Sequence, residues 1–121
     1  MQRYRFDHAT GQPVNAYGSR GLVARAVQHT PARLVVTSLW LEPAGEIGLH
    51  DAPMDQLFLV VEGGGWSLDA DGRRTAVTAG EALFWHAGER HGIASDRGLA
   101  ALVLEGEGLE PDAHLQRLEE A

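Results

Sequence analysis

The chain has 121 residues and a mass of 13.1 kDa, a length that fits one domain. Hydrophobic residues make up 44% of it, which supplies an ordinary core and argues against intrinsic disorder. Because the chain has no cysteine, disulfides, thiolate zinc sites and cysteine nucleophiles are excluded. All 10 basic residues are Arg, so a lysine Schiff base is excluded as well.

Charge and hydropathy narrow the range of partners. The 17 acidic and 10 basic residues give a formal net charge of −7, and the arginines form no basic stripe of the kind that neutralises phosphates. Residues 1–12 lack the apolar run of a signal peptide, and no stretch approaches the roughly 20 apolar residues of a membrane span. We expect a soluble cytoplasmic protein that binds neither nucleic acid nor membrane.

Short apolar segments between frequent turn signals predict an all-β fold. In chain order, the expected strands cover 22–28, 34–42, 47–50, 56–62, 66–70, 73–77, 82–86 and 99–104. The strand at 56–62 is apolar on both alternating faces, so we expect it to be covered on both sides. The glycines at 63–65 predict a strand turn rather than a phosphate-binding loop, because no helix start follows them. Asp71-Gly72 predicts the turn of a β-hairpin.

The pattern changes beyond Gly108. Pro111 suits the first turn of a helix, and Leu115 and Leu118 lie three apart, so we expect a short helix over about 111–120. The acidic residues around its start predict a solvated connection: Glu105, Glu107, Glu110 and Asp112. We expect a single domain over residues 1–121, with its core at about 20–106.

Four polar side chains stand beside turns that would direct them inward from buried strands: His50, Gln56, His86 and His91. His is the commonest protein ligand for transition metals, and two His with an oxygen donor could hold Zn, Ni, Mn or Fe. The same residues could instead line the interior as hydrogen-bonded side chains, since a buried Gln needs partners for its amide. Spacing alone leaves both interpretations open.

Two segments carry a family resemblance. Residues 45–65, GEIGLHDAPMDQLFLVVEGGG, and residues 80–95, GEALFWHAGERHGIAS, resemble the two motifs of the cupin superfamily. In the first motif His50 matches a ligand histidine. Ala52 stands where the family's second His would be, and Gln56 stands where its Glu would be.

The second motif matches at Gly80, Gly88 and His91, whereas His86 replaces the family's Pro and Ser95 its Asn. The resemblance covers most of the chain. It implies a cupin-type double-stranded β-helix, that is, a jelly-roll barrel, to which the short C-terminal helix is added.

Metal-binding cupins hold a divalent ion with three His and one Glu, so the resemblance carries over only His50 and His91 as matching ligands. Gln56 can still ligate through its amide oxygen but brings no negative charge, and Ala52 cannot ligate. We therefore predict a weak to moderate site for Zn, Ni, Mn or Fe at His50, Gln56 and His91.

Ligand contacts are expected from the aromatic residues Trp40, Phe58 and Trp85 and from His86. The first hypothesis is a cupin that binds a divalent metal and a small organic ligand, with His86 available as an acid or base. Dioxygenase, isomerase and decarboxylase chemistry all remain open, and no catalytic residue is assigned. The alternative is a non-catalytic binding or sensing module without metal, which the replacement of two ligands favours.

Assembly follows from the strand pattern. Strands that are apolar on both faces need a second covering layer, and 121 residues provide only one thin barrel. We predict a homodimer, as the resemblance also implies.

Overall fold

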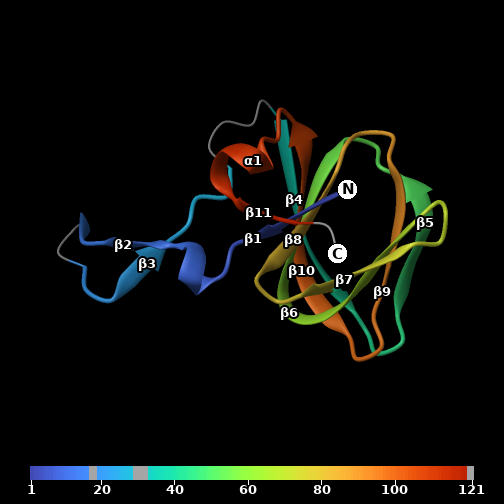
Figure 1. Cartoon of the computed structure of the whole chain (residues 1–121), viewed down its shortest axis with the longest axis horizontal. Coiled ribbons are helices and arrows are strands. Elements are labelled where there is room, and N and C mark those ends of the chain that lie inside the picture. The colour runs from blue at the N-terminus through green and yellow to red at the C-terminus, as the bar shows by residue number, and fades with distance from the viewer. Residues whose placement is uncertain (17–18, 29–32, 120–121) are drawn as a thin grey trace.

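The computed structural model describes residues 1–16, 19–28 and 33–119, and nearly all of their regular structure is β (Figure 1). In chain order the elements are β1 (Gln2–Arg5), the 3₁₀ turn η1 (His8–Thr10), β2 (Gln12–Val14), β3 (Leu22–Ala24), β4 (Arg33–Leu41), β5 (Glu46–Asp51), β6 (Asp55–Asp69), β7 (Arg74–Thr78), β8 (Glu81–Trp85), β9 (Arg90–Ala94), β10 (Leu99–Glu107), α1 (Pro111–His114) and β11 (Gln116–Leu118). The predicted all-β class is confirmed.

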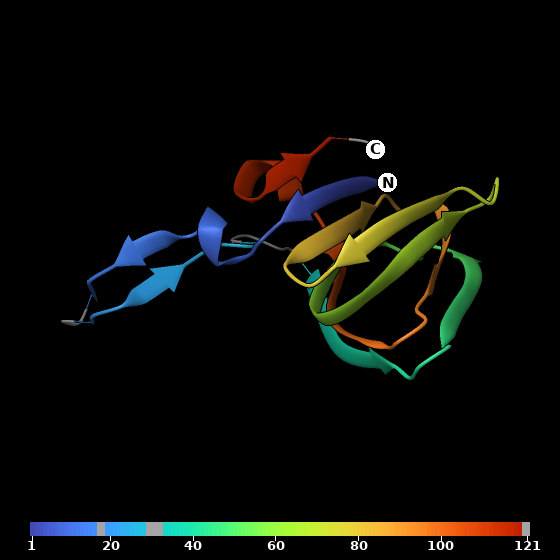
Figure 2. The same ribbon diagram turned by 60° about the horizontal axis from the view of Figure 1, so that its bottom comes forward.

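Strand β6 organises the fold, because it belongs to two parts of the sheet. Its first half pairs with β8 and β10 in the order β11-β1-β8-β6-β10-β4, and its second half lies between β7 and β9, with β5 beyond β9. Every one of these pairings is antiparallel. Figure 2 shows the strands curving around a shared interior. Apolar residues from both parts fill it, among them Phe58, Val77 and Ile93.

The prediction of a turn at 63–65 is wrong, because β6 continues through the three glycines. Gly63 adopts φ +75°, and the pairing with β10 shifts register nearby, between Ala100 and Ala101. A Cβ on Gly65 would lie 2.1 Å from the carbonyl oxygen of Ala94. The glycines therefore let β6 bend and approach β9 closely where the strand passes from one part of the sheet to the other.

The hairpin predicted at Asp71-Gly72 is confirmed. Strand β7 folds back on the second half of β6, with Trp66 opposite Ala76, and Gly72 has the positive φ of +81° that such a turn requires.

The ends of the chain differ from their sequence prediction. The helix expected over 111–120 is only α1, because Leu115 is extended and β11 then pairs with β1. Strand β1 lies inside the sheet between β11 and β8, and its Tyr4 is fully buried, so the core begins well before residue 20. The strand expected over 22–28 shortens to β3.

Strands β2 and β3 form a small hairpin that projects from the body of the molecule (Figures 1 and 2). Within the described part of the chain they pair only with each other. No helix among the described residues is long and apolar enough to cross a membrane.

Candidate functional site

A cavity of about 160 Å³ opens into the interior between the two parts of the sheet. We call it the histidine cavity. Its apolar wall comprises Leu39, Ile47, Phe58, Trp85, Ile93 and Val103, and its polar lining comprises Thr37, His50, Gln56, His91 and Glu105. Each lining residue lies on a strand, so a rigid scaffold holds the whole site.

The two histidines meet across a strand pair. His50 on β5 lies directly opposite His91 on β9, and their ring centroids are 4.6 Å apart. His50 is partly exposed, whereas His91 is 3% exposed. Side chains at directly opposed positions of an antiparallel pair share a face, so the β5–β9 register brings together two residues that are far apart in sequence.

Backbone carbonyls define the tautomer of both rings. His50 Nδ1 lies 2.7 Å from the carbonyl oxygen of Gly48, and His91 Nδ1 lies 3.1 Å from that of Glu89. A carbonyl oxygen can only accept, so the proton of each neutral ring is on Nδ1. In the neutral form of each ring, Nε2 is therefore the unprotonated acceptor.

The environment of His91 favours its neutral form. Burial lowers the pKa of His91, and the nearby His50 lowers it further, against the opposing effect of the hydrogen bond to Glu89. Trp85 stacks on the His91 ring at 3.8 Å between centroids and 13° between planes. Phe58 in turn meets the Trp85 ring edge-on at 6.1 Å, so aromatic packing orients the imidazole.

A carboxylate that the sequence interpretation placed in solvent belongs to the cavity. Glu105 lies opposite Gln56 on the β10–β6 pair, and Gln56 Nε2 donates to Glu105 Oε1 at 2.9 Å. Glu105 shares a strand face with Ala101 and Val103, both of which are buried in the interior core. That alternation was the available signal, and the prediction of a solvated connection at Glu105 is wrong.

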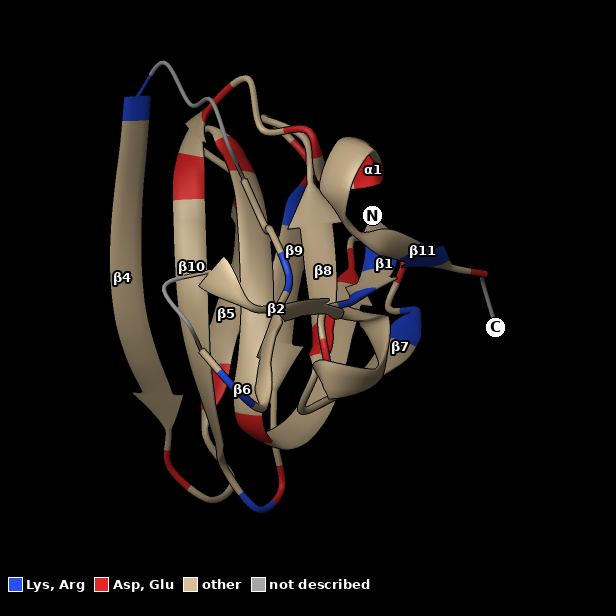
Figure 3. Ribbon diagram, turned by 90° about the vertical axis from the view of Figure 1, so that its left-hand side faces the viewer, with Lys and Arg blue, Asp and Glu red and all other residues tan. Residues whose placement is uncertain are grey.

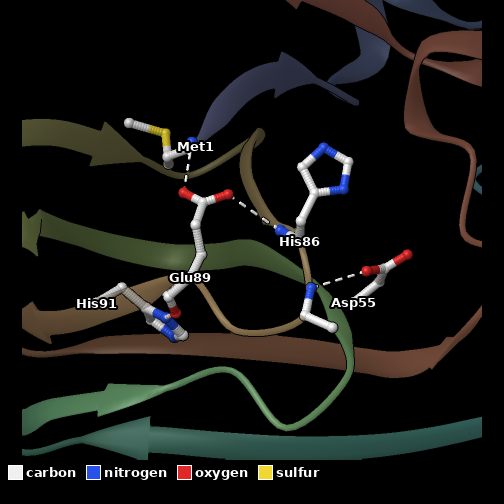
Figure 4. Close-up of polar contacts among 6 residues, drawn as sticks. Met1, Asp55, His86, Glu89 and His91 are labelled. Carbon is white, nitrogen blue, oxygen red and sulfur yellow. Dashed lines mark hydrogen bonds and ion pairs between the residues drawn. The ribbon is translucent and has the colours of Figure 1, made fainter.

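The predicted ligand contacts divide between the two faces of their strands. Phe58 lines the cavity, as does Trp85. Trp40 is 71% exposed and points away, because Thr37 and Leu39 take the inward positions of β4. His86 is also outside, following the inward Trp85, and its ring meets Phe84 edge-on at 5.0 Å. Figure 4 shows His86 and His91 on opposite sides of Glu89, with their rings directed apart.

Comparison with solved structures identifies the fold. An RmlC-like cupin from Shewanella frigidimarina is 25% identical and aligns over 64% of this chain and 68% of its own, with a TM-score of 0.56. The polyketide cyclase RemF from Streptomyces resistomycificus is 26% identical over 74% of this chain and 63% of its own, with a TM-score of 0.57. The chain has the fold of these proteins, which supports a small cupin.

Other comparisons set the extent of this likeness. A predicted oxalate decarboxylase from Thermotoga maritima has the same fold, with a TM-score of 0.54 and 24% identity over 60% of this chain and 64% of its own. The chain thus covers less than two thirds of the predicted decarboxylase and of the cyclase. No family model and no curated protein matches the chain.

The donors of the histidine cavity do not match a site of three histidines and one carboxylate. Ala52, at the position of the second histidine, is 3% exposed and packs in the apolar core. Gln56, at the position of the carboxylate, donates to Glu105. Over residues 1–16, 19–28 and 33–119, no three His, Cys, Asp or Glu side chains come together as a group that could hold a metal ion. The side chains present therefore do not supply the donor set of three histidines and one carboxylate.

Proposed function

We propose that this cupin binds a small organic molecule in the histidine cavity, through hydrogen bonds that the molecule donates and without a resident metal. The observation that carries the proposal is the polar lining of the cavity, which consists mainly of acceptors. We also propose that the strands close into a jelly-roll barrel, as in the family. The sharing of β6 between both parts of the sheet supports this.

The acceptors specify the chemistry of the ligand. His50 and His91 each offer an Nε2 lone pair, and the Glu105 carboxylate accepts from Gln56 with capacity for further donors. A buried acceptor that meets another acceptor loses its bond to water without compensation. The ligand must therefore present O–H or N–H groups, as a hydroxyl, a phenol or an amine does.

The apolar wall specifies the size and shape of the ligand. A cavity of about 150 Å³ is known to hold benzene in another protein, so about 160 Å³ accommodates a single ring with one or two small substituents. Phe58 and Trp85 offer aromatic surface to such a ring. A monocyclic phenol or a comparable hydroxylated ring fits both the wall and the acceptors.

The proposal concerns binding and assigns no catalytic residue. By their names, the polyketide cyclase and the predicted oxalate decarboxylase are enzymes. Their likeness supports the use of this cavity as a ligand site. An enzymatic reaction of the cupin on a bound hydroxyl would start from His91, because its lowered pKa keeps Nε2 in the form that accepts a proton.

Titration with phenol and with toluene tests the proposal, because the two rings have similar size and only phenol donates a hydrogen bond. We expect phenol to bind about fivefold more tightly, the effect of one neutral hydrogen bond. The preference should disappear in His50→Ala and persist in His86→Ala, which changes a histidine outside the cavity. Equal affinity for both compounds in the wild-type protein would refute the proposal.

The homodimer stays a prediction. Strand β4 is the edge of its part of the sheet and carries no charged residue apart from Arg33 at its start (Figure 3). Val35, Val36 and Trp40 on this strand are each more than half exposed, which would favour contact with a second copy. Sedimentation at micromolar concentration should give a dimer that Trp40→Glu disrupts, and a monomer mass for the wild-type chain would contradict the prediction.

A further inference from the structure

A second cavity, of about 130 Å³, lies behind Trp85. Its lining includes Arg3 on β1, Ser67 on β6, Thr75 on β7 and Arg117 on β11, and we call it the arginine pocket. Trp85 lines both this pocket and the histidine cavity, so its ring is a wall that the two cavities share. The arginine pocket is therefore a separate site from the one proposed above.

Positive charge gathers in this pocket. Four of the chain's 10 arginines line it, namely Arg3, Arg73, Arg90 and Arg117, against two carboxylates, Asp69 and Glu89. The chain as a whole has a formal net charge of −7. A concave site with excess guanidinium groups in an acidic protein favours an anionic ligand.

The two carboxylates of the pocket are bonded to other groups. Asp69 Oδ1 accepts the backbone N–H groups of Asp71 and Arg73, both at 2.9 Å. Glu89 Oε1 accepts the backbone N–H of His86 at 3.1 Å, and its Oε2 pairs with the amino group of Met1 at 2.6 Å (Figure 4). None of these contacts involves Arg3.

Arg3 supplies the observation that points to a ligand. Its Nε is buried and has no hydrogen-bond partner among the described residues. A buried charged donor without an acceptor costs free energy, and an oxyanion in the pocket would remove that cost. Arg90 and Arg117 are half exposed. Arg90 pairs with Asp51 at 3.3 Å and Arg117 pairs with Asp112 at 3.8 Å, and exposed ion pairs of this kind contribute little to stability.

We propose that the arginine pocket binds a small oxyanion, a carboxylate or a phosphate, with Arg3 as the central contact and Arg90 and Arg117 at the rim. The planar guanidinium group matches the two oxygens of either anion. The pocket's volume limits the occupant to inorganic phosphate or a small organic acid.

Titration calorimetry with sodium phosphate and with sodium succinate, in sodium chloride that keeps the ionic strength constant, tests this site. We expect saturable binding of at least one anion at millimolar concentration or below. Arg3→Met should weaken it about tenfold, as the loss of a charge-assisted hydrogen bond implies. Arg117→Met, which removes a half-exposed side chain and should leave the fold intact, should weaken binding several-fold. Arg97→Met is the matched control, because Arg97 is exposed and outside the pocket.

Backbone amide shifts in NMR spectra locate the bound anion. The resonances of Arg3, Ser67 and Thr75 should move, and that of His50 should not. Phosphate binding alone would identify a phosphate site, and succinate binding alone a carboxylate site. The proposal is overturned if neither anion saturates, if Arg97→Met weakens binding as much as Arg3→Met, or if the shifts lie outside the pocket.

Discussion

The pair formed by Gln56 and Glu105 can be tested by a double-mutant cycle. Gln56 is 7% exposed, and its amide donates to the carboxylate at 2.9 Å. A hydrogen bond to a charged group contributes about 1.5 to 3 kcal/mol to stability, so Gln56→Leu should cost about 2 kcal/mol. Glu105→Leu leaves the amide without its acceptor and should cost a similar amount, about 1 to 3 kcal/mol.

The double variant should be nearly as stable as the wild-type protein, because replacing both partners by apolar groups removes the unsatisfied group as well as the bond. The expected coupling free energy is therefore about 4 kcal/mol, the sum of the two single effects. Urea unfolding of all four proteins at neutral pH, followed by tryptophan fluorescence, measures it. The exposed ion pair of Asp51 and Arg90 is the control cycle and should couple by less than about 1 kcal/mol. Additive effects of the two leucine substitutions would refute the cavity geometry.

Three further predictions concern stability. Gly65→Ala places a Cβ against a β9 carbonyl and should lower the free energy of unfolding by about 1 to 3 kcal/mol. Gly48→Ala is the control, because Gly48 has open space around it and its substitution should not cause this loss. Equal effects of the two substitutions in denaturant unfolding would contradict the close approach of β6 to β9. The pKa of His91 in the folded protein is below the unfolded value of 6.5, so the neutral ring stabilises the fold above pH 6.5 and this stabilisation is lost as the pH falls below 6.5. In His91→Gln, the free energy of unfolding should therefore decline less steeply below pH 6.5. Tyr4→Phe removes a hydrogen bond to Asp112 and should cost about 1 to 2 kcal/mol in urea unfolding; no loss would contradict a role for that bond in docking α1.

Local patterns predicted most of the strands. Alternation and turn residues identified segments that became β4 to β8 and β10, and Asp71-Gly72 identified the hairpin. These features depend on a few neighbouring residues. The strand β9 was missed, because Gly92 and the turn before it mask a short strand whose partners, β5 and β6, are distant in sequence.

The glycines at 63–65 show where local reasoning fails. Glycine is common in turns, but it also serves where two backbones approach closely, and sequence alone does not distinguish the two uses. At Gly65 the neighbour is the backbone of Ala94, which only the tertiary fold brings there. The prediction of a C-terminal helix over 111–120 is wrong for a similar reason, since the pairing of β11 with β1 prevails over the helical pattern of the sequence.

The candidate site was predictable in part. The motif resemblance selected His50 and His91, and the structure places them opposite each other. It could not reveal the direction of His86, which depends on the alternation that turns Trp85 inward. The partner of Gln56 was also hidden, because Glu105 is about fifty residues away and meets it only through the register of β10 on β6.

The metal content of tag-free protein, purified without chelator, distinguishes a metal site from a site for an organic ligand. We propose that His50 and His91 direct their Nε2 lone pairs to an organic ligand rather than to a metal. We expect far less than one equivalent of Zn, Ni, Mn or Fe after reconstitution with each ion and dialysis, with the same result for His50→Ala. Near-stoichiometric metal in the wild-type protein that is lost in His50→Ala would contradict the proposal.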